Sequence, residues 1–210
     1  MAKIKDLPEK TLERLIIYHK VLDILEKNKI DFISSDELAK RCGINSAQLR
    51  KDLSFVGNLG TKGVGYSVKF LKYHLKKFLG INQEWNLIIG GISQLSESLL
   101  HNKELSRNGF YFMAAFDIRE EHIGRVINGV SVYNLDQLGY VVKAIKVDIG
   151  IITEEEKPEL YLETFLNHNI KAILNLSGVP LFVEKEKVQI ENFFISIALT
   201  KLSYFLKNLT

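Results

Sequence analysis

Apolar positions in the first third of the chain recur every three or four residues, which is the spacing of an amphipathic helix. The pattern predicts three helices, over residues 9–29, 35–41 and 47–56. Ser34 stands where the N-cap of the second helix is expected, and Glu37 follows three residues later, as in a capping box. Asn45 or Ser46 is placed to cap the third helix. Two short helices joined by a tight turn at residues 42–45 are typical of a helix-turn-helix.

Glycine dominates the stretch that follows the third helix. Gly60, Gly63 and Gly65 punctuate a strand-like run over residues 61–68, as in a tight β-hairpin. A basic helix over residues 68–78 is expected next. Three helices and a glycine-rich hairpin predict a winged helix-turn-helix domain, which we place at residues 1–80.

The hydrophobic pattern changes near Gly80, where apolar runs of strand length begin to alternate with amphipathic stretches of helical length. Strands separated by helices predict an α/β fold with a parallel, doubly wound, Rossmann-like sheet. We place this domain at residues 81–193, followed by a C-terminal dimerisation helix at residues 194–210. The expected strands cover residues 85–91, 110–117, 132–133, 147–153, 172–176 and 189–194, and the expected helices residues 94–105, 135–146, 158–167 and 195–209.

The last of these helices is apolar around most of its circumference. A helix of this kind must be buried. Burial in a second subunit, as in a swapped homodimer, is one interpretation. Packing on its own domain is the other, because chain termini often dock in this way.

Composition indicates a folded, water-soluble chain, since 46% of the 210 residues are hydrophobic and 25% are charged. No apolar run reaches the roughly 20 residues that span a bilayer, and the N-terminus lacks the apolar core of a signal peptide. A single cysteine, Cys42, fits the reducing cytoplasm. The net charge of +3 divides into +7 over residues 1–80 and −4 over the remainder. This division favours a polyanion as the partner of the first segment.

The third helix carries a polar face opposite Leu49, Leu53 and Val56. Arginine and lysine on an exposed helix can donate to base edges and phosphates in the major groove, and Lys62 at the hairpin tip can reach a phosphate or the minor groove. A solvated helix without a ligand has a similar composition, but the capped preceding helix, the hairpin and the local charge favour DNA. The candidate DNA-binding residues are Ser46, Gln48, Arg50, Lys51, Ser54, Lys62, Gly63 and Tyr66.

The turn after the first strand of the second domain lies where a Rossmann fold binds the pyrophosphate of a dinucleotide. Of the three glycines in G-x-G-x-x-G only Gly91 is present, and Ser93 and Ser96 take the other two positions. Ser93 adds a Cβ where pyrophosphate should approach, together with a hydroxyl that could bind phosphate. Asp117 could accept from a ribose hydroxyl, and Arg119 could instead neutralise a 2′-phosphate. The alternative is a turn that no longer binds a ligand.

The sequence offers little evidence for other chemistry. Its five histidines are scattered, and no P-loop, G-x-S-x-G or H-E-x-x-H motif occurs. We therefore predict neither a catalytic residue nor a metal site. The run of three carboxylates at residues 154–156 is interpreted as a solvated helix start, stabilised by the helix dipole.

Several motifs together resemble the Rex family of redox-sensing transcriptional repressors. They are Q-L-R-K-D-L-S at residues 48–54, Gly57, G-V-G-Y at 63–66, Trp85, A-A-F-D at 114–117, Gly124-Arg125, I-L-N at 173–175 and E-N at 191–192. The resemblance covers residues 5–207. It implies a homodimer with an N-terminal winged helix and a Rossmann domain whose last helix swaps between subunits. It also implies a repressor that binds an inverted-repeat operator when the NADH/NAD⁺ ratio is low and is released by NADH.

Carried over residue by residue, the resemblance assigns DNA contacts to Arg50, Lys51, Ser54 and Lys62. It matches the pyrophosphate loop to residues 91–96 and the adenosine-ribose acid to Asp117. The candidate NADH/NAD-binding residues are Gly91, Ile92, Ser93, Gln94, Leu95, Ser96, Asp117, Thr153 and Asn175.

The chain departs from the family pattern at three places. The loop G-x-G-N-L-G is G-I-S-Q-L-S here, and the family's Thr-Val-Pro-Ala is Thr-Glu-Glu-Glu at residues 153–156. An Asp two positions after the Asn matched by Asn192 is replaced by Phe194. In the family that Asp belongs to a polar switch. Its expected partner on the first helix, Arg14, is left without that carboxylate.

Three functions remain open at this point. The first is a repressor that NADH releases from its operator. The second is a DNA-binding dimer whose nucleotide site has decayed and which is constitutive or controlled by another ligand. The third is a small NAD-dependent enzyme, for which the sequence offers no positioned His, Lys or Tyr. The sequence favours a regulator over an enzyme.

Overall fold

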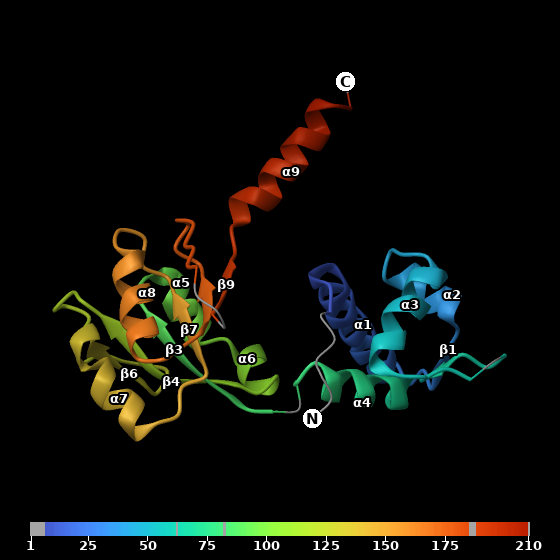
Figure 1. The fold of residues 1–210 in the computed structure, drawn as a ribbon, viewed down its shortest axis with the longest axis horizontal. Coiled ribbons are helices and arrows are strands. Elements are labelled where there is room, and N and C mark those ends of the chain that lie inside the picture. The colour runs from blue at the N-terminus through green and yellow to red at the C-terminus, as the bar shows by residue number, and fades with distance from the viewer. Residues whose placement is uncertain (1–6, 62, 82, 185–187, 210) are drawn as a thin grey trace. The chain divides into compact units, whose positions relative to one another are not determined.

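The computed structural model describes residues 7–61, 63–81, 83–184 and 188–209. The chain divides into two units, of which the first ends at Gln83 and the second begins at Glu84 (Figure 1). Each unit has its own hydrophobic core.

Four helices and a short antiparallel sheet form the first unit. The helices are α1 (Glu9–Lys27), α2 (Ser35–Arg41), α3 (Ser46–Val56) and α4 (Val68–Phe78), and the sheet pairs β1 (Phe32–Ile33) with β2 (Tyr66–Ser67). Each helix turns a leucine-bearing stripe into one core, which includes Leu15, Leu22, Leu38, Leu49 and Leu71. The helix-turn-helix is therefore held by the apolar periodicity of its sequence.

Side chains cap both helices of the helix-turn-helix. Ser34 Oγ accepts from the backbone N–H of Glu37 at 3.1 Å. Asn45 Oδ1 accepts from the backbone N–H of Gln48 at 2.8 Å. These contacts confirm Ser34 as a cap and select Asn45 over Ser46. The Glu37 carboxylate does not close the expected capping box, because it pairs with Arg41 on the next turn of α2.

The glycine-rich hairpin is shorter than the sequence predicts. Its two arms meet in a single bridge between Thr61 and Gly65, and the strand that follows pairs with β1 instead. Gly65 has φ +99°, and a Cβ there would lie 2.4 Å from the carbonyl oxygen of Ile33. The strand-like run expected over 61–68 is thus interrupted, because the backbone at Gly63 and Gly65 is left-handed.

The second unit contains a seven-stranded sheet in the order β5-β6-β4-β3-β7-β8-β9. All neighbouring strands run parallel except β5 and β6, so the parallel strands follow the Rossmann order and confirm the doubly wound α/β prediction. The strand order reverses between β3 and β7, and ligands bind such sheets at the carboxyl edge near that point. The strands are β3 (Trp85–Gly90), β4 (Phe110–Asp117), β5 (Val126–Ile127), β6 (Val130–Asn134), β7 (Ile149–Ile152), β8 (Ala172–Asn175) and β9 (Gln189–Asn192).

Helices cover both faces of this sheet. On one face α7 (Leu138–Ala144) and α8 (Pro158–Asn167) pack against Ile88 and Phe116. On the other, α5 (Gln94–Leu100) packs against Ile89 and Ala115. The single helix expected over residues 94–105 is wrong, because Asn102 caps a separate helix, α6 (Lys103–Arg107). A 3₁₀ turn, Leu135–Gln137, precedes α7.

The C-terminal helix α9 (Ile195–Lys207) leaves the sheet after β9 (Figure 1). None of its residues is buried in the single chain. Its apolar side chains Ile197, Leu199, Leu202 and Tyr204 are between 49% and 71% exposed. Across the described residues, no helix combines the length and apolar character needed to cross a bilayer.

Candidate nucleic-acid interface and nucleotide site

Helix α3 presents three of the predicted DNA-binding side chains to solvent. Arg50, Lys51 and Ser54 are exposed, whereas Leu49 and Leu53 on the opposite face are buried in the core. Arg50 Nη1 donates to Ser35 Oγ, at the start of α2, over 2.9 Å. The cationic groups of α3 are therefore available to a ligand, and one of them is already oriented by the neighbouring helix.

A groove of about 650 Å³ runs between α3, the start of α2 and the hairpin. Gly63 lies exposed on its rim, whereas the ring of Tyr66 is buried and forms a wall. A Cβ at Gly60 would lie 2.8 Å from that ring, so glycine is needed for this close approach. Lys62, the predicted phosphate contact at the hairpin tip, lies outside the described residues. The groove gives the predicted interface a concave surface.

A fully buried carboxylate, Asp52, fastens α3 to α1. Arg14 donates to it through Nε at 2.6 Å and Nη2 at 2.9 Å, and the Tyr18 hydroxyl donates at 2.7 Å. The Gln48 side-chain amide also donates to Asp52, at 2.7 Å, so in this structure it points toward α1. Arg14, which was expected to lack a carboxylate, therefore has one within its own unit.

These contacts set the ionisation of the Asp52 carboxyl. Burial alone would raise its pKa, but the hydrogen bonds from Arg14, Tyr18 and Gln48 outweigh burial and lower it. The same network raises the pKa of the Arg14 guanidinium, which stays charged. Asp52 lies between Leu49 and Leu53 on the inward face of α3, and that position is the sequence signal that could have revealed it.

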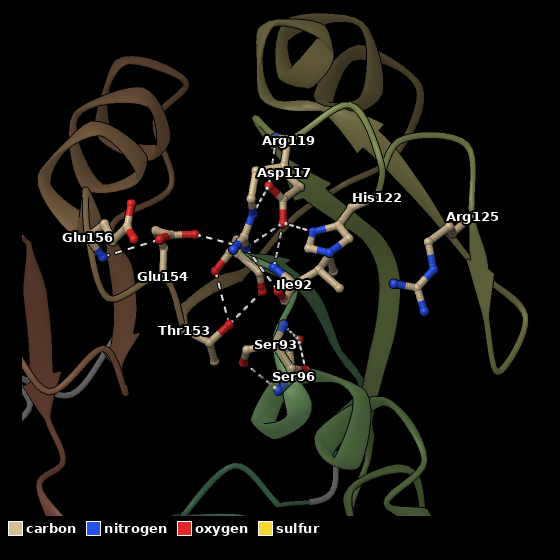
Figure 2. A network of polar contacts seen from close by, with 12 residues as sticks. Ile92, Ser93, Ser96, Asp117, Arg119, His122, Arg125, Thr153, Glu154 and Glu156 are labelled. Atoms are coloured by element: carbon tan, nitrogen blue, oxygen red, sulfur yellow. Dashed lines mark hydrogen bonds and ion pairs between the residues drawn. The ribbon is translucent and has the colours of Figure 1, made fainter.

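In the second unit, two serines close the turn that follows β3. Ser96 Oγ accepts from the backbone N–H of Ser93 at 2.7 Å and donates to its carbonyl at 2.8 Å, while Ser93 Oγ accepts from the N–H of Ser96 at 3.3 Å. This reciprocal capping box uses both hydroxyls and two N–H groups of the turn (Figure 2). The Ser93 hydroxyl, which was predicted as a possible phosphate ligand, therefore caps α5 through its oxygen, and its O–H can still donate.

Gly91 retains a role that only glycine can fill. Its φ is +87°, and a Cβ would lie 2.6 Å from the backbone nitrogen of Glu154. Thr153 Oγ1 donates to the carbonyl oxygens of Gly90 and Gly91, at 3.1 and 2.7 Å. The tight approach at Gly91 is thus made by the end of β7, and Thr153 fastens the two segments together.

Asp117 ends β4 where the ribose acid of a dinucleotide site is expected, and its carboxylate is fully buried. The backbone N–H of Ile92 donates to Oδ2 at 2.7 Å, and His122 Nδ1 lies 2.8 Å from the same oxygen. Arg119 contributes its backbone N–H, Nε and Nη2, at 2.9, 3.1 and 3.0 Å (Figure 2). Burial would raise the pKa of Asp117, but these hydrogen bonds hold it far below its usual value.

Arg119 also binds Glu154, which comes directly after Thr153 at the end of β7. Its Nη2 lies 3.1 Å from Glu154 Oε2. Glu154 is only 6% exposed and accepts from the backbone N–H of Glu156 as well. The interpretation of this acidic run as a solvated helix start is wrong for Glu154, because the arginine draws its carboxylate inward, while Glu155 and Glu156 are exposed.

Of the remaining predicted cofactor residues, Asn175 has structural partners. Asn175 Nδ2 donates to Asn192 Oδ1 and to the carbonyl of Val179, both at 2.7 Å, and its Oδ1 accepts from Ser177. Gln94 and Leu95 form the first turn of α5. Among the described residues, no cluster of three or more His, Cys, Asp or Glu side chains is placed to hold a metal ion.

Sequence reasoning missed the Arg119–Glu154 pair and the role of His122. The paired residues are 35 positions apart, and only the sheet brings their ends together. A further feature had no sequence signal: the ring of Tyr161, on α8, fills the space beside Gly90, where a Cβ would lie 2.4 Å from it. For the Arg119–Glu154 pair, the only signal in the sequence was the position of Arg119, two residues after Asp117 at the end of its strand.

Two family models match the chain. "Putative DNA-binding protein N-terminus" matches residues 6–54, and "CoA binding domain" matches residues 82–179. The first match ends within α3, and the second covers the sheet from β3 to β8. The division into a DNA-binding unit and a nucleotide-binding type of fold agrees with the structure.

Proteins named redox-sensing transcriptional repressor Rex are similar over nearly the whole chain. Those of Syntrophobacter fumaroxidans and Desulfitobacterium hafniense are each 36% identical, covering 97% and 96% of this chain and 98% and 96% of theirs. The crystal structure of RSP with beta-NAD⁺ and operator DNA has a TM-score of 0.91 at 31% identity, covering 97% of this chain and 94% of that one. The structure of RSP with beta-NADH has a TM-score of 0.87 at 29% identity, covering 97% and 96%.

The buried network in the first unit yields a stability prediction. Asp52→Asn should lower the free energy of unfolding by about 3–5 kcal/mol at pH 7, because it leaves the Arg14 guanidinium without its buried partner. Since the folded pKa of Asp52 is lowered, its stabilisation is present above roughly pH 4 and is lost as the pH falls. Urea unfolding between pH 7 and pH 3 measures both effects.

The exposed Glu163→Gln variant is the control for this measurement. It should keep the stability of the parent at pH 7. The parent should also lose stability more steeply on acidification than Asp52→Asn. Equal stability of Asp52→Asn and Glu163→Gln at neutral pH would contradict the role assigned to the network.

Proposed function

The chain belongs to the Rex family of redox-sensing transcriptional repressors. From this premise we propose that it is a DNA-binding repressor whose affinity for its operator is lowered by NADH. The observation that carries the proposal is the geometry of α3. Arg50 and Lys51 face solvent from a helix that Asp52 fixes from behind. A rigid helix with exposed cations can enter the major groove and read base edges.

The operator that suits this chain is an inverted repeat bound by a homodimer. Two-fold symmetry of the protein is matched by two-fold symmetry of the site, with half-sites about one or more turns of duplex apart. Helix α9 lies within the candidate dimerisation segment, residues 194–210, and none of the residues of α9 is buried in the single chain. Covering its apolar side chains with a second copy would remove them from water.

The second unit is the candidate NADH-binding domain. The turn at residues 91–96 lies at the carboxyl edge of the sheet near the reversal of strand order, and Asp117 ends the adjacent strand. NADH, when bound, supplies a ligand whose abundance reports the redox state of the cell. The position of these residues fits the cofactor, but the hydrogen-bonding capacity of Asp117 is already taken by Arg119, His122 and Ile92.

The protein is a regulator and not an enzyme, as its named relatives are transcriptional repressors. Its site of action is the cytoplasm, where its DNA target lies. A second candidate function is a repressor whose nucleotide site has decayed. The engaged carboxylate of Asp117 and the serine capping box favour that candidate, so the response to NADH must be measured directly.

The first experiment titrates NADH and NAD⁺ into the full-length protein bound to a labelled inverted-repeat duplex. We expect NADH to weaken operator binding and NAD⁺ to do so much less. Fluorescence anisotropy at fixed salt measures the effect, since protein–DNA affinity depends steeply on ionic strength. Operator binding that is unchanged by either nucleotide would support the decayed site instead.

Substitution of Arg50 tests the DNA interface. Arg50→Ala should weaken specific operator binding by about 1–3 kcal/mol, because a bidentate contact to a guanine would be lost. The control is Arg107→Ala, at the end of α6 in the second unit, which removes the same charge. If both variants bind the operator like the parent, α3 is not the helix that reads the DNA.

A charge placed on α9 tests the dimer. Leu202→Glu should weaken dimerisation by about 2 kcal/mol or more, because a buried apolar contact would be replaced by a charge. Lys201→Glu, one residue away and also exposed in the single chain, is the control. Light scattering coupled to gel filtration measures the mass. A dimer that persists in both variants at low micromolar concentration would refute the assignment of α9.

A further inference from the structure

One nitrogen of Arg119 joins three segments at the carboxyl edge of the sheet. Nη2 lies 2.9 Å from the carbonyl oxygen of Ile92, 3.0 Å from Asp117 Oδ2 and 3.1 Å from Glu154 Oε2 (Figure 2). These partners follow β3, end β4 and follow β7, respectively. The guanidinium therefore lies across the place where the sheet opens toward a ligand.

The carboxylate of Asp117 has no acceptor capacity left in this arrangement. Two carboxylate oxygens offer about four lone-pair sites. Five groups converge on them: the backbone N–H groups of Ile92 and Arg119, Nε and Nη2 of Arg119, and Nδ1 of His122. A ribose hydroxyl can donate to Asp117 only after one of these groups has left.

Arg119 is the group that can leave at least cost to the fold. Its side chain is 41% exposed, whereas that of His122 is 19% exposed and the N–H of Ile92 belongs to the turn itself. After the side chain of Arg119 has left, Asp117 still accepts from Ile92, from His122 and from the backbone N–H of Arg119. Glu154 is only 6% exposed, and the departure of Arg119 would leave its buried carboxylate without a cation. The cost of that unpaired carboxylate is what holds Arg119 in place.

We propose that the side chain of Arg119 is an intramolecular competitor of the adenosine ribose, held by Glu154, and that its displacement sets the NADH concentration to which this repressor responds. The inference rests on the proposed function, because it concerns the same nucleotide site. When a binding-competent state is only fractionally populated, the apparent dissociation constant rises by the inverse of that fraction. The chain is therefore tuned to respond at higher NADH than a site with a free acid would.

The test is a double variant, Arg119→Ala with Glu154→Gln. It removes one positive and one negative charge together, so the net charge of the cluster is unchanged, and the glutamine oxygen can still accept from the N–H of Glu156. We expect the full-length double variant to bind NADH at least about tenfold more tightly than the full-length parent, as measured by fluorescence titration. The NADH concentration that releases the operator should fall by the same factor.

Arg125→Gln is the matched control. Arg125 is 42% exposed, close to the value for Arg119, and its Nη2 pairs with Glu97 at 2.6 Å rather than with Asp117. We expect this variant to bind NADH like the parent. The single variant Glu154→Gln, which loosens Arg119 without removing it, should fall between the parent and the double variant and supplies a result if the double variant does not fold.

The outcomes separate this inference from the proposed function. Equal NADH affinity in the parent and both Glu154 variants would overturn the competition while leaving an NADH-responsive repressor. Weaker binding in the double variant would show that Arg119 binds the nucleotide itself, which also overturns it. Operator binding without any NADH affinity in parent or variants would refute the NADH response, and the competition with it.

Discussion

Both units of this protein are organised around a carboxylate that is removed from water. A buried charge is tolerated only when its lone pairs are filled by donors, so its position dictates where the surrounding segments must lie. Asp52 draws Arg14 and Tyr18 of α1 onto α3, and Asp117 draws Arg119 and the N–H of Ile92 onto the end of β4. Each acid thereby fixes the elements that carry its unit's function, and in both cases the hydrogen bonds outweigh burial and hold the pKa low.

The same constraint has opposite consequences in the two units. In the first, Asp52 accepts from Arg14 and Tyr18 of α1 and from Gln48 of α3, which leaves the side chains of Arg50 and Lys51 exposed to solvent. In the second, Asp117 stands at the edge where a ligand is expected, and its saturation by Arg119 uses the very acceptor that a ribose needs. A buried carboxylate with filled lone pairs therefore supports binding at α3 in the first unit, and it opposes binding at the nucleotide site in the second.

Local order was predictable from the sequence because it depends on neighbours in the chain. The caps Ser34 and Asn45, the helix over Pro158–Asn167 and the strand over Phe110–Asp117 follow from spacing and cap chemistry within a few residues. Contacts across the fold were not: Arg14 and Asp52 are 38 residues apart, and Arg119 and Glu154 are 35 apart. A run of three glutamates is typical of a solvated helix start, and only the parallel pairing of β3 with β4 and β7 shows that its first member faces an arginine.

The serines of the turn and the side chain of Arg119 have the same effect, because each occupies hydrogen-bonding groups that a nucleotide would use. In a turn with three glycines the backbone N–H groups point at an open site and must be satisfied by the ligand. Here Ser93 and Ser96 satisfy two of those groups internally, and Asp117 satisfies a third at Ile92, so these three N–H groups are already occupied when a nucleotide approaches. A ligand must then compete with contacts the protein already makes, and the most exposed of these, Arg119, is the one whose three acceptors lie on three different segments. Its displacement would remove the one side chain that contacts all three segments, while the hydrogen bonds from the Ile92 N–H to Asp117 and from Thr153 to Gly91 would still join the ends of β3, β4 and β7.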